Sequence, residues 1–190
     1  RAKVGITIEM LPWARAYNQA LKESDACVFT TTRTPEREAL FKWVGPVGSS
    51  DWALYGNAER KLKLGSIEDA RPMIIGTYLG DARDEYFRSR GFKVESVSDD
   101  LSNPRKLLLN RIDLWAASVV RGSMLVAQND WTGKVVPLLV FHKVDLYMAC
   151  HVDLPTALID RLNAALQTMV RDGTTKAIEK KYAHWPLPPT

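Results

Sequence analysis

The stretch MIIGTYLGDARDEYFRSRGFKVESV, residues 73–97, decides the fold class. A short apolar run opens it, Gly80 marks a turn, and Asp81 then stands at the position of a helix N-cap. Gly91 follows as the helix C-cap, and residues 92–97 have the composition of a second strand. Two strands joined through one helix normally lie parallel in one sheet. The stretch therefore predicts a βαβ unit and an α/β fold.

The N-terminal region has the same order of elements. Apolar residues alternate in KVGITIEM, residues 3–10, which predicts a strand. PWARAYNQALK, residues 12–22, has helical apolar spacing behind its proline, and ACVFTTT, residues 26–32, favours a strand. We therefore expect another parallel βαβ unit here.

The rest of the chain supplies a crossover and further elements. FKWVGPVGSSDWALYG, residues 41–56, has no clean period and is typical of an extended crossover or a hinge. Four more predictions follow from periodicity: a helix ending near Asn110, a strand at 112–117, strands within 131–154, and helices at 155–173 and 175–185. The whole pattern predicts an α/β chain with two sheets joined through extended crossovers.

Composition restricts the classes of protein. The chain has 190 residues, 46% hydrophobic and 25% charged, with a net charge of +4, as expected for a soluble globular protein. No apolar run reaches the roughly 18 residues of a membrane span, and no long basic run indicates nucleic-acid binding. The chain starts at Arg1 without a Met or a signal peptide, so we expect a trimmed form with the signal peptide removed.

Signatures of catalysis and metal binding are missing from the sequence. It contains no G-x-S-x-G, P-loop, G-x-G-x-x-G or H-E-x-x-H motif, and its histidines lack ligand spacing. We therefore expect no enzyme activity, no metal and no cofactor. Cys27 and Cys150 permit one disulfide, but each stands among apolar residues, and we favour two buried thiols over a disulfide.

An arginine occupies an unusual position in TTTRTPERE, which begins at Thr30. Thr34 is a candidate helix N-cap and Pro35 a candidate first helical residue, which places Arg37 in the first turn. A cation there is disfavoured by roughly 0.3–1 kcal/mol, and a bound anion would offset this. A surface arginine paired with its neighbouring glutamates is the alternative, and spacing alone favours it.

Two other features also have two interpretations each. The turn before Asp81 offers backbone N–H groups to an anion, but simple capping of the helix by Asp81 is favoured. The aromatic residues Trp13, Trp43, Trp52 and Tyr55 either stack on a ligand in a cleft or fill the core, and Trp43 is better placed in the core.

Taken in order, five segments resemble the extracytoplasmic solute-binding proteins of ABC importers, the family that includes polar amino-acid binders. The segments span nearly the whole chain: EMLPWARAYNQAL, TTTRTPERE with FKWVGPV, SIEDARPMIIGTYLGDARDEYF, LLLNRIDLWAAS, and DLPTALIDRLNAALQTMVRDGTTKAIEKKY. The resemblance implies the two-lobed type II periplasmic-binding fold with two hinge strands. Lobe one would comprise residues 1–54 and 144–190, and lobe two residues 55–143. The first strand and helix of the family are expected to be missing from this chain.

The resemblance also implies a binding site in lobe one. The hydroxyl groups of Thr30 and Thr32 and the guanidinium of Arg37 would hold a solute carboxylate. Trp13 would stand near the wall that covers the solute. Arg37 is thus the implied anchor of the carboxylate.

Lobe two would complete the site. The helix start at Asp81 and Ala82 would donate backbone hydrogen bonds to the same carboxylate. Ser118 stands where amino-acid binders carry the aspartate that holds the α-ammonium group, which argues against a standard amino acid as the solute.

The expected function is therefore capture of a small carboxylate-bearing solute, amino acid or similar, by a periplasmic monomer. The protein would present the solute to an ABC permease in the membrane. Two alternatives stay open, a periplasmic sensor domain of a signalling protein and an enzyme similar to cyclic-acid dehydratases, for which Asp81 is the candidate acid or base.

Overall fold

The computed structural model describes residues 1–99 and 101–182, which form six α-helices, three short 3-10 helices and six strands. The helices are α1 (Trp13–Lys22), α2 (Ala82–Ser89), α3 (Ser102–Leu108), α4 (Val119–Gln128), α5 (Thr156–Arg171) and α6 (Thr174–Tyr182). The strands are β1 (Cys27–Thr32), β2 (Lys42–Asn57), β3 (Ile74–Tyr78), β4 (Lys93–Val97), β5 (Leu114–Ser118) and β6 (Val135–Cys150). Part of the helix predicted at 175–185 lies outside the described residues.

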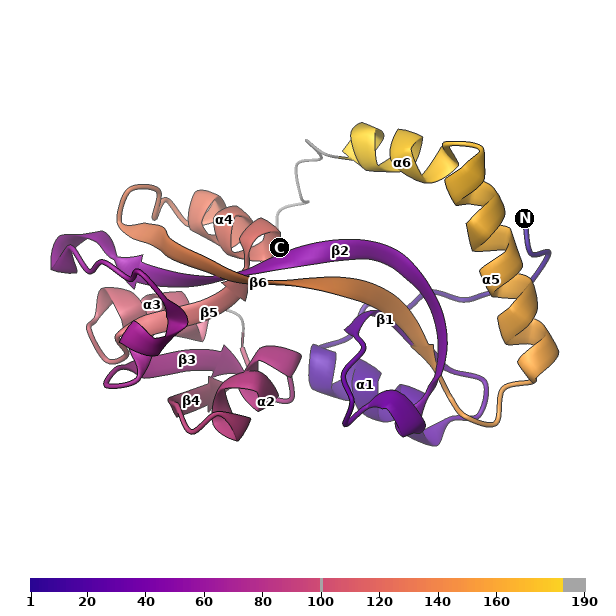
Figure 1. Cartoon of the computed structure of the whole chain (residues 1–190), viewed down its shortest axis with the longest axis horizontal. Helices are drawn as coiled ribbons and strands as arrows, with labels where there is room; N and C mark the ends of the chain where they lie inside the picture. Colours follow the sequence, from indigo (N-terminus) through magenta and orange to yellow (C-terminus); the bar gives the residue numbers. More distant parts are fainter. Residues whose placement is uncertain (100, 183–190) are drawn as a thin grey trace.

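One continuous sheet connects the two ends of the molecule. Its strand order is β1-β6-β2-β5-β3-β4, and the long strands β2 and β6 pair antiparallel along its middle (Figure 1). The prediction of two separate sheets is wrong, because the crossovers themselves pair with each other. β3 pairs parallel with β4 and with β5, which confirms the βαβ unit predicted from residues 73–97.

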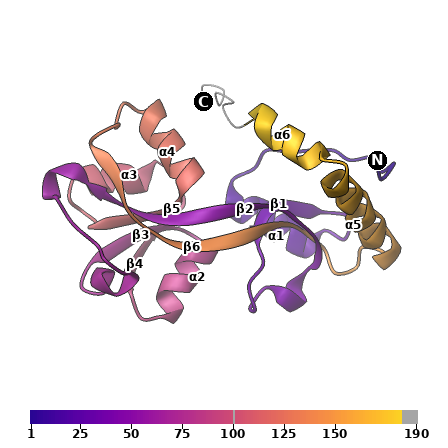
Figure 2. The ribbon, with the colours of Figure 1, turned by 45° about the horizontal axis from the view of Figure 1, so that its top comes forward.

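The sheet extends through two halves of the molecule, each with its own helices. We call lobe one the half that contains α1, β1, α5 and α6, and lobe two the half that contains β3, β4, β5 and helices α2 to α4. Each half has its own apolar clusters, around Phe41 and Ile159 in lobe one and around Phe87 and Ile112 in lobe two. Only β2 and β6 run through both halves in the views of Figures 1 and 2. The exact boundaries at 54/55 and 143/144 stay a prediction.

Two predicted elements are wrong. Residues 3–10 form no strand, and Ile6 and Met10 are 75% and 93% exposed, because no neighbouring strand in the described part of the chain pairs with them. Residues 35–37 form a turn that leads into a short 3-10 helix, η1 (Glu38–Leu40), and not into an α-helix. After the turn, η1 is the only helical segment before the chain enters β2 at Lys42.

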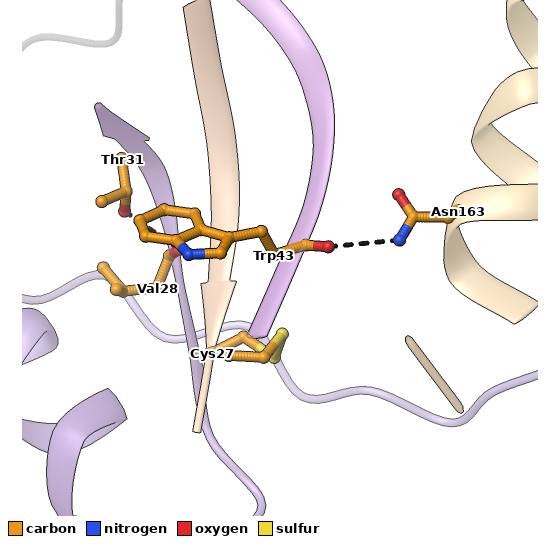
Figure 3. Close-up of a disulfide and its surroundings, with 6 residues drawn as sticks. Cys27, Val28, Thr31, Trp43 and Asn163 are labelled. Atoms are coloured by element: carbon orange, nitrogen blue, oxygen red, sulfur yellow. Dashed lines mark hydrogen bonds between the residues drawn. A yellow bond between two sulfur atoms is a disulfide. The ribbon is translucent and has the colours of Figure 1, made fainter. Parts of the chain in front are cut away.

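α5 fixes the bent end of β2. The pairing of β2 with β6 shifts register between Val44 and Gly48. Asn163 of α5 donates a hydrogen bond to the carbonyl oxygen of Trp43 at 3.1 Å (Figure 3). Its Oδ1 accepts one from the Gly45 N–H at 3.0 Å. These bonds give partners to two backbone groups near the start of β2, a part of the strand that does not pair with β5.

A disulfide joins the first strand to the last. Cys27 at the start of β1 lies directly opposite Cys150 at the end of β6, and their sulfur atoms are bonded (Figure 3). The prediction of two free thiols is therefore wrong. The two cysteines are 123 residues apart, and only the antiparallel pairing of β1 with β6 brings them together.

A buried carboxylate ties α2 to the sheet of lobe two. Asp84 accepts hydrogen bonds from Thr77 of β3 at 2.6 Å, from Arg88 at 3.0 Å and from Ser96 of β4. Burial raises the pKa of Asp84, but the bonds from Ser96, Thr77 and Arg88 outweigh it and place the pKa below its ordinary value. The ionised form of Asp84 therefore stabilises lobe two.

Replacing Asp84 with asparagine is expected to lower the free energy of unfolding by about 1–2 kcal/mol at pH 7. Because the pKa of Asp84 is lower in the folded state, its contribution is complete above the ordinary value of 3.8 and is lost as the pH falls through the folded-state pKa. Urea unfolding of both proteins between pH 7 and pH 3 measures this. Asp51→Asn, which changes an exposed carboxylate, is the control, and an Asp84→Asn chain as stable as this control at pH 7 would contradict the assignment.

Candidate functional site

A cleft of about 450 Å³ lies where the two lobes face each other across β2 and β6. Residues of β1, β2 and β6 and the first turns of α2 and α4 line it: Thr30, Thr32, Ser49, Ser50, Trp52, Asp81, Arg83, Ser118, Val120, Arg121, Met124 and Leu146. Another hollow, of about 590 Å³, lies between Arg1, Lys3 and α5. It belongs to one lobe, contains no acidic side chain and brings no strand ends together, so we place the candidate site in the cleft.

The cleft brings together Thr30, Thr32, Asp81 and Ser118, all of them predicted from sequence. Thr30 and Thr32 are two positions apart in β1 and share one face of the strand, whereas Thr31 between them is fully buried. Asp81 and Ser118 come from lobe two. Residues that are far apart in the chain therefore meet from both lobes.

Two helices begin at the cleft for a topological reason. β3 and β5 are parallel, so their carboxyl ends lie at the same edge of the sheet, and α2 and α4 start there. Asp81 caps α2 by accepting a hydrogen bond from the Arg83 N–H at 2.8 Å, and Ser118 caps α4 by accepting one from the Arg121 N–H at 3.2 Å. Capping by Asp81, predicted from sequence, is confirmed.

Two arginines in the cleft were missed by the sequence reasoning. Arg83 donates from Nη2 to Oδ2 of Asp81 at 2.8 Å, and its guanidinium lies 5.8 Å from the centre of the Trp52 ring. Arg121 comes from the first turn of α4. Arg83 lies two residues after the N-cap Asp81, and Arg121 lies three residues after the N-cap Ser118. An arginine in the first turn of a helix that follows a parallel strand is the signal that could have identified them.

Arg37 and Trp13 do not line this cleft and form a bridge between the lobes beside it. Arg37 is 2% exposed, and its guanidinium lies 5.1 Å from the ring centre of Tyr17 and 5.9 Å from that of Trp13. Its Nη2 donates to the Gly80 carbonyl oxygen at 3.1 Å and to Oε1 of Glu85 at 2.8 Å. Trp13 Nε1 donates to the same carbonyl oxygen at 2.9 Å. We call these contacts the lobe bridge.

The lobe bridge changes the interpretation of Arg37. The surface pairing with neighbouring glutamates is wrong, because Glu38 accepts from Arg33 Nε at 2.7 Å and Arg37 pairs with Glu85. Direct contact of Arg37 and Trp13 with a solute stays a prediction. Arg37 Nε and Glu85 Oε2 are buried and have no hydrogen-bond partner among the residues that the structure describes. Burial raises the pKa of the adjoining Tyr17.

Ala82 and the remaining aromatic residues have packing roles. The Ala82 side chain is buried against Trp52 and Val144 and does not line the cleft, so only its backbone N–H is available for the predicted role. Trp43 packs on Phe41, as predicted, and Tyr55 is buried in a core cluster of lobe two. Trp52 belongs to a buried cluster and also lines the cleft.

The arrangement suits an anion. Five side chains of the cleft carry hydroxyl groups, namely those of Thr30, Thr32, Ser49, Ser50 and Ser118. Two guanidinium groups and two helix starts add positive charge. Within residues 1–99 and 101–182, no three His, Cys, Asp or Glu side chains gather as metal ligands.

Solved structures share this fold at low sequence identity. A histidine kinase sensor domain with similarity to periplasmic binding proteins aligns with a TM-score of 0.82 and 16% identity, over 91% of this chain and 76% of that one. An ancestral arginine-binding protein bound to glutamine aligns with a TM-score of 0.78 and 20% identity, over 92% of this chain and 78% of that one. The ancestral amino acid-binding protein AncCDT-1, a precursor of cyclohexadienyl dehydratase, aligns with a TM-score of 0.73 and 18% identity, over 90% of this chain and 75% of that one. No protein-family model and no curated protein matches the chain.

Proposed function

We propose that this chain, whose fold is that of the type II periplasmic binding proteins, captures a small carboxylate-bearing solute between its two lobes. The observation that carries the proposal is the composition of the cleft. Thr30 and Thr32 of lobe one face it together with Asp81 and Ser118 of lobe two, as expected for a solute that both lobes contact. A cleft of about 450 Å³ is within the range of small-molecule sites.

The carboxylate has suitable donors on both sides of the cleft. The hydroxyl groups of Thr30 and Thr32 donate from lobe one. The first turns of α2 and α4 donate backbone N–H groups from lobe two, where intrahelical acceptors are missing. Because these donors come from different lobes, the full set acts on a solute only when the lobes are closed.

Closure is helped by the lobe bridge. Arg37 of lobe one pairs with Glu85 of lobe two, while the cleft beside them stays open to a solute. A contact that exists only between closed lobes raises the population of the closed form. It therefore also raises the apparent affinity of the chain for its solute. In this proposal Arg37 acts on the solute through lobe closure.

The transport role and the location are also proposals. The disulfide supports an oxidising compartment such as the periplasm. None of the helices in the described part of the chain has the length and apolar character that a membrane crossing requires. We propose a monomer that delivers its solute to an ABC permease.

A further strand beside residues 4–10 is part of the proposal. The segment has no regular secondary structure, its apolar residues Ile6, Ile8 and Met10 alternate, and all three are exposed. Alternating apolar residues with which none of the described strands pairs support a neighbouring strand in lobe one, such as the one expected from the family.

Two alternatives are tested by separate observations. The likeness to a sensor domain supports a signalling role, and a kinase segment in the full gene product would favour it. The likeness to a dehydratase precursor supports an enzyme. The enzyme alternative would be favoured if the chain converts a bound cyclic acid to a product and the Asp81→Asn variant does not.

Thermal unfolding of the chain with a panel of amino acids, keto acids and dicarboxylates tests the proposed function. At least one carboxylate is expected to raise the melting temperature, because a ligand at 100 times its Kd adds about 2.7 kcal/mol to the free energy of unfolding. Methyl esters of the same acids serve as controls and are expected to have no effect. A panel in which no carboxylate raises the melting temperature would refute the proposal.

A further inference from the structure

We infer that Trp13 is a positioning residue of the proposed site and acts on the solute through the carbonyl oxygen of Gly80. The inference rests on the proposed function and adds to it a residue of lobe one that orients a group of lobe two. Trp13 does not line the cleft. Its indole N–H nevertheless donates to Gly80 at 2.9 Å, and the next residue, Asp81, does line the cleft.

The Gly80 carbonyl oxygen is bound from the opposite lobe. Gly80 precedes the N-cap of α2, and the Glu85 N–H donates to the Asp81 carbonyl oxygen at 3.3 Å. The Gly80 carbonyl therefore lies outside the hydrogen bonds of the helix itself. It accepts from Trp13 Nε1 and, at 3.1 Å, from Arg37 Nη2. Two donors of lobe one thus share the two lone pairs of this oxygen.

Steric packing does not hold the turn that contains Gly80. Leu79 and Gly80 are both exposed, and a Cβ atom built at Gly80 would meet no heavy atom within 4 Å beyond its chain neighbours. Gly80 has φ +71°, a backbone region in which glycine turns with little steric restriction. The orientation of the turn therefore depends on its hydrogen bonds.

One peptide group connects the lobe bridge with the cleft. The carbonyl of Gly80 and the N–H of Asp81 belong to the same planar group, and this N–H donates to the Tyr78 carbonyl oxygen at 3.1 Å. Because Trp13 and Arg37 bind the oxygen, the plane of the group is fixed from both sides. Asp81 begins α2 at the cleft, so the bonds from lobe one set the direction in which this helix start faces a solute.

Trp13 can orient the turn because its ring is anchored in lobe one. It is the first residue of α1, and it packs against the apolar cluster that contains Val28 of β1. The same strand supplies Thr30 and Thr32 to the cleft. α1 and α2 lie next to each other on the facing sides of the two lobes (Figures 1 and 2). The indole N–H thus links the strand on one side of the solute to the helix start on the other.

Two matched substitutions separate positioning from stability. Trp13→Phe removes the indole N–H and keeps an aromatic ring. Trp43→Phe is the control, because Trp43 Nε1 also donates to a backbone carbonyl oxygen, that of Glu38 at 3.1 Å, but within lobe one. A purely structural role of Trp13 would make the two variants alike.

Amide exchange measured by NMR tests the positioning in the absence of solute. Trp13→Phe is expected to speed the exchange of the Asp81 and Glu85 amides at least threefold, and Trp43→Phe is expected to leave both rates unchanged. Equal rates in Trp13→Phe and the unmodified chain would overturn the inference.

Isothermal titration calorimetry tests the effect on binding, and its probe is the acid of the thermal panel that most raises the melting temperature. Trp13→Phe is expected to weaken binding at least about threefold, the size that one hydrogen bond provides, and Trp43→Phe by less than about twofold. Equal affinity of Trp13→Phe and the unmodified chain, or equal weakening by both variants, would overturn the role of Trp13 and leave solute binding intact. If no acid of the panel binds the unmodified chain, the proposed function is refuted and the inference falls with it.

Discussion

A chain in which Cys27 and Cys150 are both alanine is expected to have a free energy of unfolding about 4–5 kcal/mol lower than the disulfide-bonded chain. The bond closes a loop with a sequence separation of 123 residues, and removing it restores the entropy of that loop to the unfolded state. Urea unfolding without reductant, followed by tryptophan fluorescence, measures the difference.

A reductant supplies the matched control for the disulfide. Reducing the unmodified chain is expected to lower its midpoint to that of the double variant, whereas the double variant is expected to be insensitive to reductant. A double variant with an unchanged midpoint would show that the link between β1 and β6 adds nothing to the sheet pairing there.

Replacing Glu85 with glutamine is expected to lower the free energy of unfolding by about 3 kcal/mol. The change leaves the buried guanidinium of Arg37 without its counter-charge, and breaking a buried ion pair typically costs 3–5 kcal/mol. We expect the lower end of that range, because the Glu85 side chain is 42% exposed. Urea unfolding at neutral pH measures the loss.

The same variant tests whether the lobe bridge holds the lobes together. Small-angle X-ray scattering of Glu85→Gln is expected to give a larger radius of gyration than that of the unmodified chain. Glu95→Gln is the control, because Glu95 pairs with Lys106 inside lobe two and not across the lobes. An unchanged radius together with lower stability would give Arg37 and Glu85 a structural role only.

Much of the fold could be predicted because its signals are local. The cap at Asp81 and the glycine after α2 identify the βαβ unit from 73 to 97, and apolar spacing identifies α5. The strand expected at 3–10 failed for a non-local reason. Alternation gives residues 3–10 the character of a strand, but a strand also needs a neighbour, and none of the described strands pairs with them.

Part of the candidate site could also be predicted from the sequence. A local capping pattern identified Asp81, and the family resemblance implied Thr30, Thr32 and Ser118. The structure brings these four residues into one cleft. The partner of Arg37 could not be predicted, since Glu85 is 48 residues away and meets it only across the two lobes. The pairing of Cys27 with Cys150 depends likewise on the register of β1 with β6.

Amide hydrogen exchange with and without the carboxylate that most raises the melting temperature tests the central claim most directly. With the solute bound, amide exchange is expected to slow both in β1 around Thr30 and Thr32 and in the first turns of α2 and α4. Both regions are expected to respond at the same solute concentrations, because one solute contacts both lobes. Protection confined to one lobe, or protection at the hollow beside Arg1 and α5, would contradict it.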